Sequence, residues 1–124
     1  MLKNIVLVPL LIIASSALGN DNALSPALTL RCAPCHGPDL NGVGGVFPSL
    51  MTSQLVKSGN LDGVIKFITH GSPADSQSLV KMPAKGGHLD LGDEEIREIA
   101  KQVIELARNY VEKKAPPTAS RDGY

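Results

Sequence analysis

Apolar residues recur with a helical period in the last third of the chain. Five of them stand at intervals of three or four positions: Ile96, Ile99, Val103, Leu106 and Tyr110. This spacing is typical of one buried face of an α-helix. Acidic residues at positions 93–95 place negative charge at the positive end of the helix dipole, and Pro116 and Pro117 end the pattern. The sequence therefore predicts a helix over residues 93–114.

Two shorter segments carry helix signals at their ends. Residues 25–31 begin with Ser25, which can cap the first free amides, and with a proline that suits the first turn. Residues 61–70 follow Asn60 as the expected cap and precede Gly71 as the expected stop. Three apolar residues of the second segment are expected to face inward: Val64, Ile65 and Ile68.

Turn residues dominate the chain between these helices. Residues 37–48 contain four glycines and two prolines, and residues 71–92 show no clear periodicity. A compact domain usually keeps such a long irregular loop for a functional reason. No alternating apolar pattern, which would indicate strands, competes with the helical one. The predicted fold class is all-α, with long loops between the helices.

The first nineteen residues have the composition of an export signal. Lys3 provides a positive start, a short apolar stretch follows, and small residues end at Gly19. An uncleaved membrane anchor is the alternative, but polar residues interrupt the run before the roughly 20 apolar residues that a span needs. We expect cleavage near Gly19/Asn20 and a periplasmic protein with no membrane span, a domain over residues 20–114 and a flexible tail over 115–124.

Composition and charge narrow the function only slightly. The 124 residues fit one domain, and 12 basic residues balance 12 acidic ones, so the net charge gives no reason to expect nucleic acid as a partner. The chain has no Trp, two Phe and two Tyr, so aromatic side chains can fill little of its interior. An embedded macrocycle would supply the missing bulk, although this indication alone is weak.

Both cysteines of the chain lie in one motif, Cys32-Ala33-Pro34-Cys35-His36. This is the spacing that attaches c-type haem: each thiol can form a thioether with one vinyl group of the porphyrin. The histidine that follows is then the proximal ligand of the iron. The motif predicts one covalently bound haem c, held by Cys32 and Cys35, with His36 as an axial ligand.

Three other interpretations of the cysteine pair are weaker but open. A thioredoxin-like dithiol requires a preceding strand, which the pattern does not show. A structural zinc site requires four ligands, and the chain has no second cysteine pair. A disulfide across two residues would close a very small loop with little entropic benefit.

The motif and the segments after it resemble the class I c-type cytochromes, the monohaem cytochrome c family. The resemblance rests on the attachment motif, residues 37–42, Phe47-Pro48-Ser49-Leu50, Met82-Pro83 and the acidic start of the last helix, in that order. It covers most of residues 20–114. It implies a cytochrome c-like domain in which three or more helices surround one covalently bound haem. In the family an aromatic residue often joins the first and last helices, whereas this chain offers Leu28 and Gln102.

The resemblance also implies the second axial ligand. Met82, followed by Pro83, stands where the family has its distal methionine, and a thioether sulfur favours ferrous iron and raises the reduction potential. His88 and His70 are rivals, and Met51 is expected on the side of His36. Pro48 is the family position whose carbonyl accepts a hydrogen bond from the proximal imidazole, although a plain turn proline is an alternative.

The predicted function is one-electron transfer between redox proteins, without bond chemistry of its own. Lys81 and Lys85 flank Met82, and with Lys57 they can attract an acidic redox partner to the haem edge. Ordinary solvated lysines are an equal alternative. Two other functions stay open at this point: a haem subunit of a larger dehydrogenase or oxidase, and a gas-binding protein with five-coordinate iron.

Overall fold

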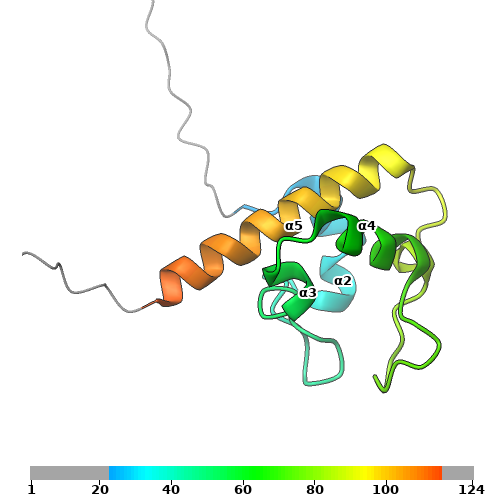
Figure 1. Ribbon diagram of the computed structural model, residues 1–124, viewed down its shortest axis with the longest axis horizontal. Coiled ribbons are helices and arrows are strands. Elements are labelled where there is room, and N and C mark those ends of the chain that lie inside the picture. Colours follow the sequence, from blue (N-terminus) through cyan, green and yellow to red (C-terminus); the bar gives the residue numbers. More distant parts are fainter. Residues whose placement is uncertain (1–22, 116–124) are drawn as a thin grey trace, which may run out of the picture.

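The computed structural model describes residues 23–115, and in this range the chain is helical (Figure 1). Its elements, in chain order, are α1 (Pro26–Arg31), α2 (Ala33–His36), α3 (Gln54–Lys57), α4 (Leu61–His70), the 3₁₀-helix η1 (Ala84–Gly87) and α5 (Asp93–Lys114). Within these residues no strand forms, and an isolated bridge joins Val43 to Phe47. The expected all-α class is confirmed. The expected signal over 1–19 and tail residues 116–124 lie outside the described residues.

Helix α5 follows the predicted bounds and forms one wall of the core. Its first turn carries the three acidic residues and its last turn Lys113 and Lys114, so both ends complement the helix dipole. Five residues of one face are buried: Ile96, Ile99, Ala100, Val103 and Ala107. Figure 1 shows the C-terminal part of α5 extending past the other helices. There Val111 is exposed.

Helix α4 begins and ends where its capping residues predict. The side-chain oxygen of Asn60 accepts a hydrogen bond from the Gly63 amide at 2.9 Å. At the other end Gly71 has φ +76, and its amide donates to the Phe67 carbonyl at 2.7 Å. Val64 is buried against α5, and the expected inward residues Ile65 and Ile68 pack against the same core.

Helix α1 also follows its capping signals. The Ser25 hydroxyl accepts from the Leu28 amide at 3.3 Å, and Pro26 occupies the first turn. Leu28 is fully buried in one cluster with Ile96 and Ile99, and it stands where the family often has an aromatic residue. Gln102 brings no comparable apolar group, and its buried Oε1 has no hydrogen-bond partner among the described residues.

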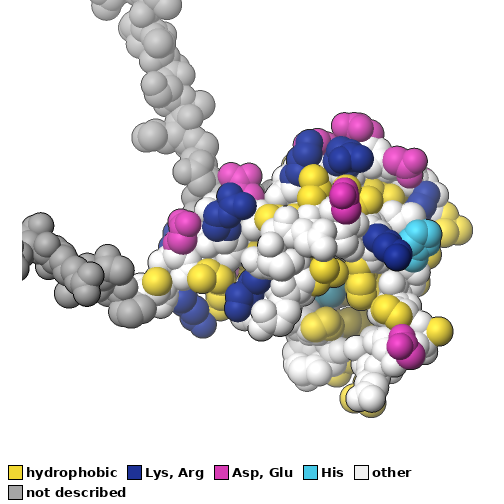
Figure 2. Space-filling view, viewed as in Figure 1, with side chains coloured by type: hydrophobic (Ala, Val, Ile, Leu, Met, Phe, Trp, Pro, Cys, Tyr) yellow, Lys and Arg dark blue, Asp and Glu magenta, His cyan; other side chains and the backbone are white. Residues whose placement is uncertain are grey.

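Helices α4 and α5 form the upper part of the molecule, and the two long loops extend below them (Figure 1). Hydrophobic side chains gather in a recess beneath α4, between the helices and the loops (Figure 2). None of the helices in residues 23–115 combines the length and the apolar character that a membrane span requires.

Candidate haem site

The recess is a cavity of about 670 Å³, within the range of roughly 300 to 1,000 Å³ typical of cofactor sites. Four residues with chemically active side chains line it: Cys32, Cys35, His36 and Met82. The rest of its wall is mainly apolar, from the loops, α3, α4 and α5, and includes Phe47, Leu50, Leu55, Val56, Val64, Phe67, Ile68, Val80, Ile99 and Val103. The cavity therefore brings together all four residues that the sequence predicts as haem contacts.

The two cysteines and His36 are placed by a single helical turn. The Cys32 carbonyl accepts from the Cys35 amide at 3.2 Å and from the His36 amide at 2.9 Å. The Cys32 amide in turn donates to Leu28 at 3.0 Å, so α2 continues directly from α1. Both cysteines are free thiols. Burial, with a smaller contribution from Cys35, raises the pKa of the Cys32 thiol to about 11, so at pH 7 it is the neutral S–H.

His36 is buried and oriented by a backbone carbonyl. Its Nδ1 lies 2.9 Å from the Pro48 oxygen, so Nδ1 carries the proton that it donates, and Nε2 is left as the nitrogen with a free lone pair. The loop between the two residues is closed tightly, since the Gly42 amide donates to the His36 carbonyl at 2.8 Å. A Cβ on Gly42 would lie 2.9 Å from the Ser49 nitrogen and would overlap the Phe47 oxygen.

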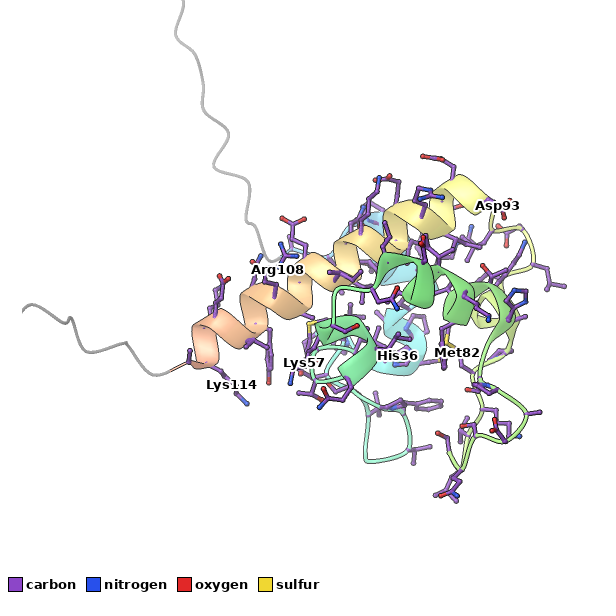
Figure 3. All side chains as sticks on the ribbon, viewed as in Figure 1. His36, Lys57, Met82, Asp93, Arg108 and Lys114 are labelled. Atoms are coloured by element: carbon purple, nitrogen blue, oxygen red, sulfur yellow. The ribbon has the colours of Figure 1, made fainter. Side chains whose placement is uncertain are left out.

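Met82 lies on the opposite loop and is fixed to the end of α4. The Ser72 amide donates to the Met82 carbonyl, and the Met82 amide donates to the Ser72 hydroxyl, both at 2.9 Å. Figure 3 shows His36 on α2 and Met82 on the loop, both beneath α4, and both residues line the cavity. Nothing in the sequence pattern singles out Ser72, because its role depends on a contact across the loop.

The rival ligands lie elsewhere. His70 is exposed at the end of α4, and His88 is half-buried with Nδ1 at 3.3 Å from Arg31 Nη1. Neither histidine lines the cavity. Met51 is 4% exposed within the apolar core and does not line the cavity either, so its expected place on the side of His36 stays a prediction. Ligation by Met82 stays a prediction, but Met82 is the methionine that the cavity presents.

The other interpretations of the cysteine pair find no support in the described residues. In residues 23–115 no group of three or more His, Cys, Asp or Glu gathers that could hold a metal ion such as zinc. No strand precedes Cys32 in that range, as a thioredoxin-like site would require. The cysteines are not joined by a disulfide.

The three lysines predicted to attract a partner have different environments. The Lys81 ammonium donates to the Ala74 carbonyl at 2.6 Å, and the Lys85 ammonium donates to the Leu91 carbonyl at 2.7 Å. Lys57 is exposed at the end of α3 (Figure 3). Lys81 lines the cavity, so at least this charge stands at its edge.

The donor set fits haem c. An imidazole and a thioether are a known axial pair for haem iron, and two thiols in one helical turn match the attachment spacing. The mostly apolar wall suits a macrocycle, and only Phe47 and Phe67 contribute aromatic rings to it. Those rings could not fill the cavity alone.

Comparison with known proteins places the chain in a family. The family model described as Cytochrome C oxidase, cbb3-type, subunit III matches residues 28–101, which include the attachment motif and Met82. No curated protein and no solved structure matches the chain significantly. The chain therefore belongs to this cytochrome c family and is a haem-based electron carrier of the class I c type.

Proposed function

We propose that the mature chain is a periplasmic cytochrome with one haem, bound covalently by Cys32 and Cys35, with His36 and Met82 as axial ligands. It carries one electron at a time between redox proteins. One observation supports this most: a single apolar cavity is lined by both thiols, the imidazole and the thioether. With both axial positions taken, substrates cannot reach the iron, so the protein performs no bond chemistry.

Bound haem iron supplies the one-electron couple, and the protein's own residues set its environment. The Pro48 carbonyl holds the proton on His36 Nδ1 and makes the imidazole a stronger donor. The two hydrogen bonds between Ser72 and Met82 fix the backbone that carries the sulfur. The apolar wall excludes water, which favours the reduced form with its lower charge. These features keep the geometry similar in both oxidation states.

Purified protein tests this proposal directly. A pyridine haemochrome spectrum is expected to give one c-type haem per chain. The intact mass is expected to equal that of residues 20–124 plus one haem, which also reports removal of the signal. A colourless protein with the mass of its amino acids alone would refute covalent haem binding.

Lysine steering is a further part of the proposal. Removing two charges in K57Q/K81Q is expected to lower the electron-transfer rate with an acidic partner protein roughly threefold to tenfold at low salt. The difference should vanish at high salt, because ions screen exposed charges. K101Q is the control, since Lys101 pairs with Glu98 on α5 and does not line the cavity. Rates that do not depend on salt would rule steering out.

A permanently bound subunit is the second candidate. The matched family is described as a subunit of an oxidase, and the part of α5 beyond Ala107 offers exposed surface such as Val111. A native gel of the cell extract stained for haem separates the two. The band of a free carrier would migrate as a single chain, and that of a bound subunit as part of a larger complex.

A further inference from the structure

Arg31 connects the haem attachment helix to the loop that follows Met82. It is the last residue of α1 and directly precedes Cys32. Its guanidinium makes a two-pronged pair with Asp90, with Nη1 at 3.0 Å from Oδ1 and Nη2 at 2.7 Å from Oδ2. Nη1 also lies 3.3 Å from His88 Nδ1, and Nε lies 3.9 Å from a Glu95 oxygen at the start of α5.

The segment over residues 83–91, which directly follows Met82, is held together by its own hydrogen bonds. Its backbone is closed by hydrogen bonds from Gly86 to Pro83, from His88 to Lys85 and from Leu91 to His88, each at 3.0 Å. The Lys85 ammonium adds a fourth bond inside the segment, to the Leu91 carbonyl. Leu91 is 2% exposed and anchors the end of the segment in the core. Because the segment is held together in this way, we expect a change in the position of Asp90 to change the position of Met82.

The 83–91 segment lies close both to the Met82 side chain and to Arg31, which precedes the first attachment cysteine. A Cβ on Gly86 would be 3.7 Å from the Met82 Cε and 3.9 Å from the Arg31 carbonyl oxygen. Arg31 itself lines the cavity beside Cys32. The chain that carries the predicted distal ligand thus passes within contact distance of the residue next to the first attachment cysteine.

We infer that Arg31 and Asp90 are a positioning pair that holds the Met82 sulfur in place relative to the attached haem. Arg31 is fixed to the haem through the neighbouring Cys32, and Asp90 is fixed to Met82 through the 83–91 segment. This inference rests on the proposed ligation by His36 and Met82.

The geometry of the Arg31–Asp90 pair suggests that breaking it will measurably weaken the hold on Met82. Two parallel hydrogen bonds between a guanidinium and a carboxylate are more specific than a single contact, and a lysine cannot reproduce them. The Asp90 side chain is 66% exposed, so water screens the carboxylate, whereas the Arg31 side chain is only 24% exposed. The guanidinium holds the pKa of Asp90 below its ordinary value, so the carboxylate is ionised at neutral pH.

The experiment measures how readily imidazole displaces Met82 in the ferric holoprotein. Displacement is followed by loss of the sulfur-to-iron absorption in the red. D90N is expected to raise the affinity for imidazole about fivefold, the scale of one well-formed surface pair. R31K, which keeps the charge but not the two-pronged geometry, is expected to fall between D90N and the wild type. The R31Q/D90N double variant should exceed D90N only slightly, because the two residues act together.

E98Q is the matched control, because Glu98 forms a 2.6 Å ion pair with Lys101 within α5 and neither residue lines the cavity. Its imidazole affinity should equal that of the wild type. Equal affinities in D90N, R31K and the wild type would overturn the inference, and so would an equal rise in E98Q. If the wild type carries haem but lacks the sulfur-to-iron absorption, the proposed Met82 ligation fails instead. R31K keeps the charge and nearly the volume of Arg31, so it provides a second test should D90N fail to mature.

Discussion

Replacing Met82 by leucine is expected to lower the reduction potential by on the order of 0.1 V or more, within the span of about 0.8 V that axial ligands cover. Leucine keeps the volume and the apolar character of the side chain, so the cavity stays filled. What it removes is the sulfur, which stabilises ferrous over ferric iron. Redox titration of M82L and the wild type measures the shift, and the sulfur-to-iron absorption in the red should vanish with it.

Met51 gives this experiment its control. M51L also loses one thioether, but Met51 is buried in the core and does not line the cavity. Its potential and its absorption should therefore match those of the wild type. Carbon monoxide adds an independent measurement: the reduced wild type should resist it, whereas M82L should bind it rapidly. An unchanged potential in M82L would show that another residue is the ligand, and rapid binding to the wild type would favour a gas-binding function.

The sequence was sufficient for the helices whose ends carry strong local signals. Ser25, Asn60 and Gly71 each make the capping contact that their residue type predicts, and α5 combines an acidic first turn with a long apolar stripe. These signals act between residues three or four positions apart. They can therefore be identified without knowledge of the tertiary structure.

Helices α2, α3 and η1 were not predicted, because each is only four residues long. A single turn has too few positions to show a period, and it is stable only through what packs around it. Helix α2 depends on its continuation from α1 through Cys32. In η1, Lys85 has φ +53, a conformation that non-glycine residues rarely adopt and that the sequence does not indicate.

The residues of the site also differ in whether local sequence is enough to predict them. Cys32, Cys35 and His36 form a local motif whose chemistry follows from its spacing, whereas Met82 depended on the resemblance to a family. The contacts that position these groups are distant in sequence: Ser72 with Met82, and Arg31 with Asp90, 59 residues apart. Neither pair has a sequence signature, so only the structure could identify them.

A close approach of two backbones governs the Met82 side of the site. Gly71 is buried, has φ +76 and lies against the peptide that follows Met82. A Cβ at this position would overlap the Met82 carbonyl oxygen and lie 2.7 Å from the Pro83 carbonyl carbon. These are backbone atoms, and the hydrogen bonds between Ser72 and Met82 hold them in place. We therefore expect a side chain at position 71 to displace this backbone and, with it, the Met82 sulfur.

Gly71→Ala is therefore expected to destabilise the holoprotein by about 2 to 6 kcal/mol. Gly71 has φ +76 and ψ -164, a backbone conformation open essentially to glycine, which costs a residue with a side chain about 1 to 3 kcal/mol, and the overlap costs roughly 1 to 3 kcal/mol more. Small domains have only about 5 to 15 kcal/mol of total stability, so the variant is expected to lose a large share of it. Denaturant unfolding of the holoprotein measures the loss, and weakened sulfur-to-iron absorption would report displacement of Met82.

Gly59→Ala separates the two contributions. Gly59 has φ +70, but its Cβ would meet no other atom within 4 Å, so this variant carries the conformational cost without the overlap. It should lose only about 1 to 2 kcal/mol and keep the absorption of the wild type. If G71A is no less stable than G59A, the loop has room to relax, and the close packing of Gly71 against Met82 does not fix the ligand. If G71A loses stability but keeps the absorption, the overlap is absorbed away from the sulfur, and the hydrogen bonds to Ser72 alone set its position.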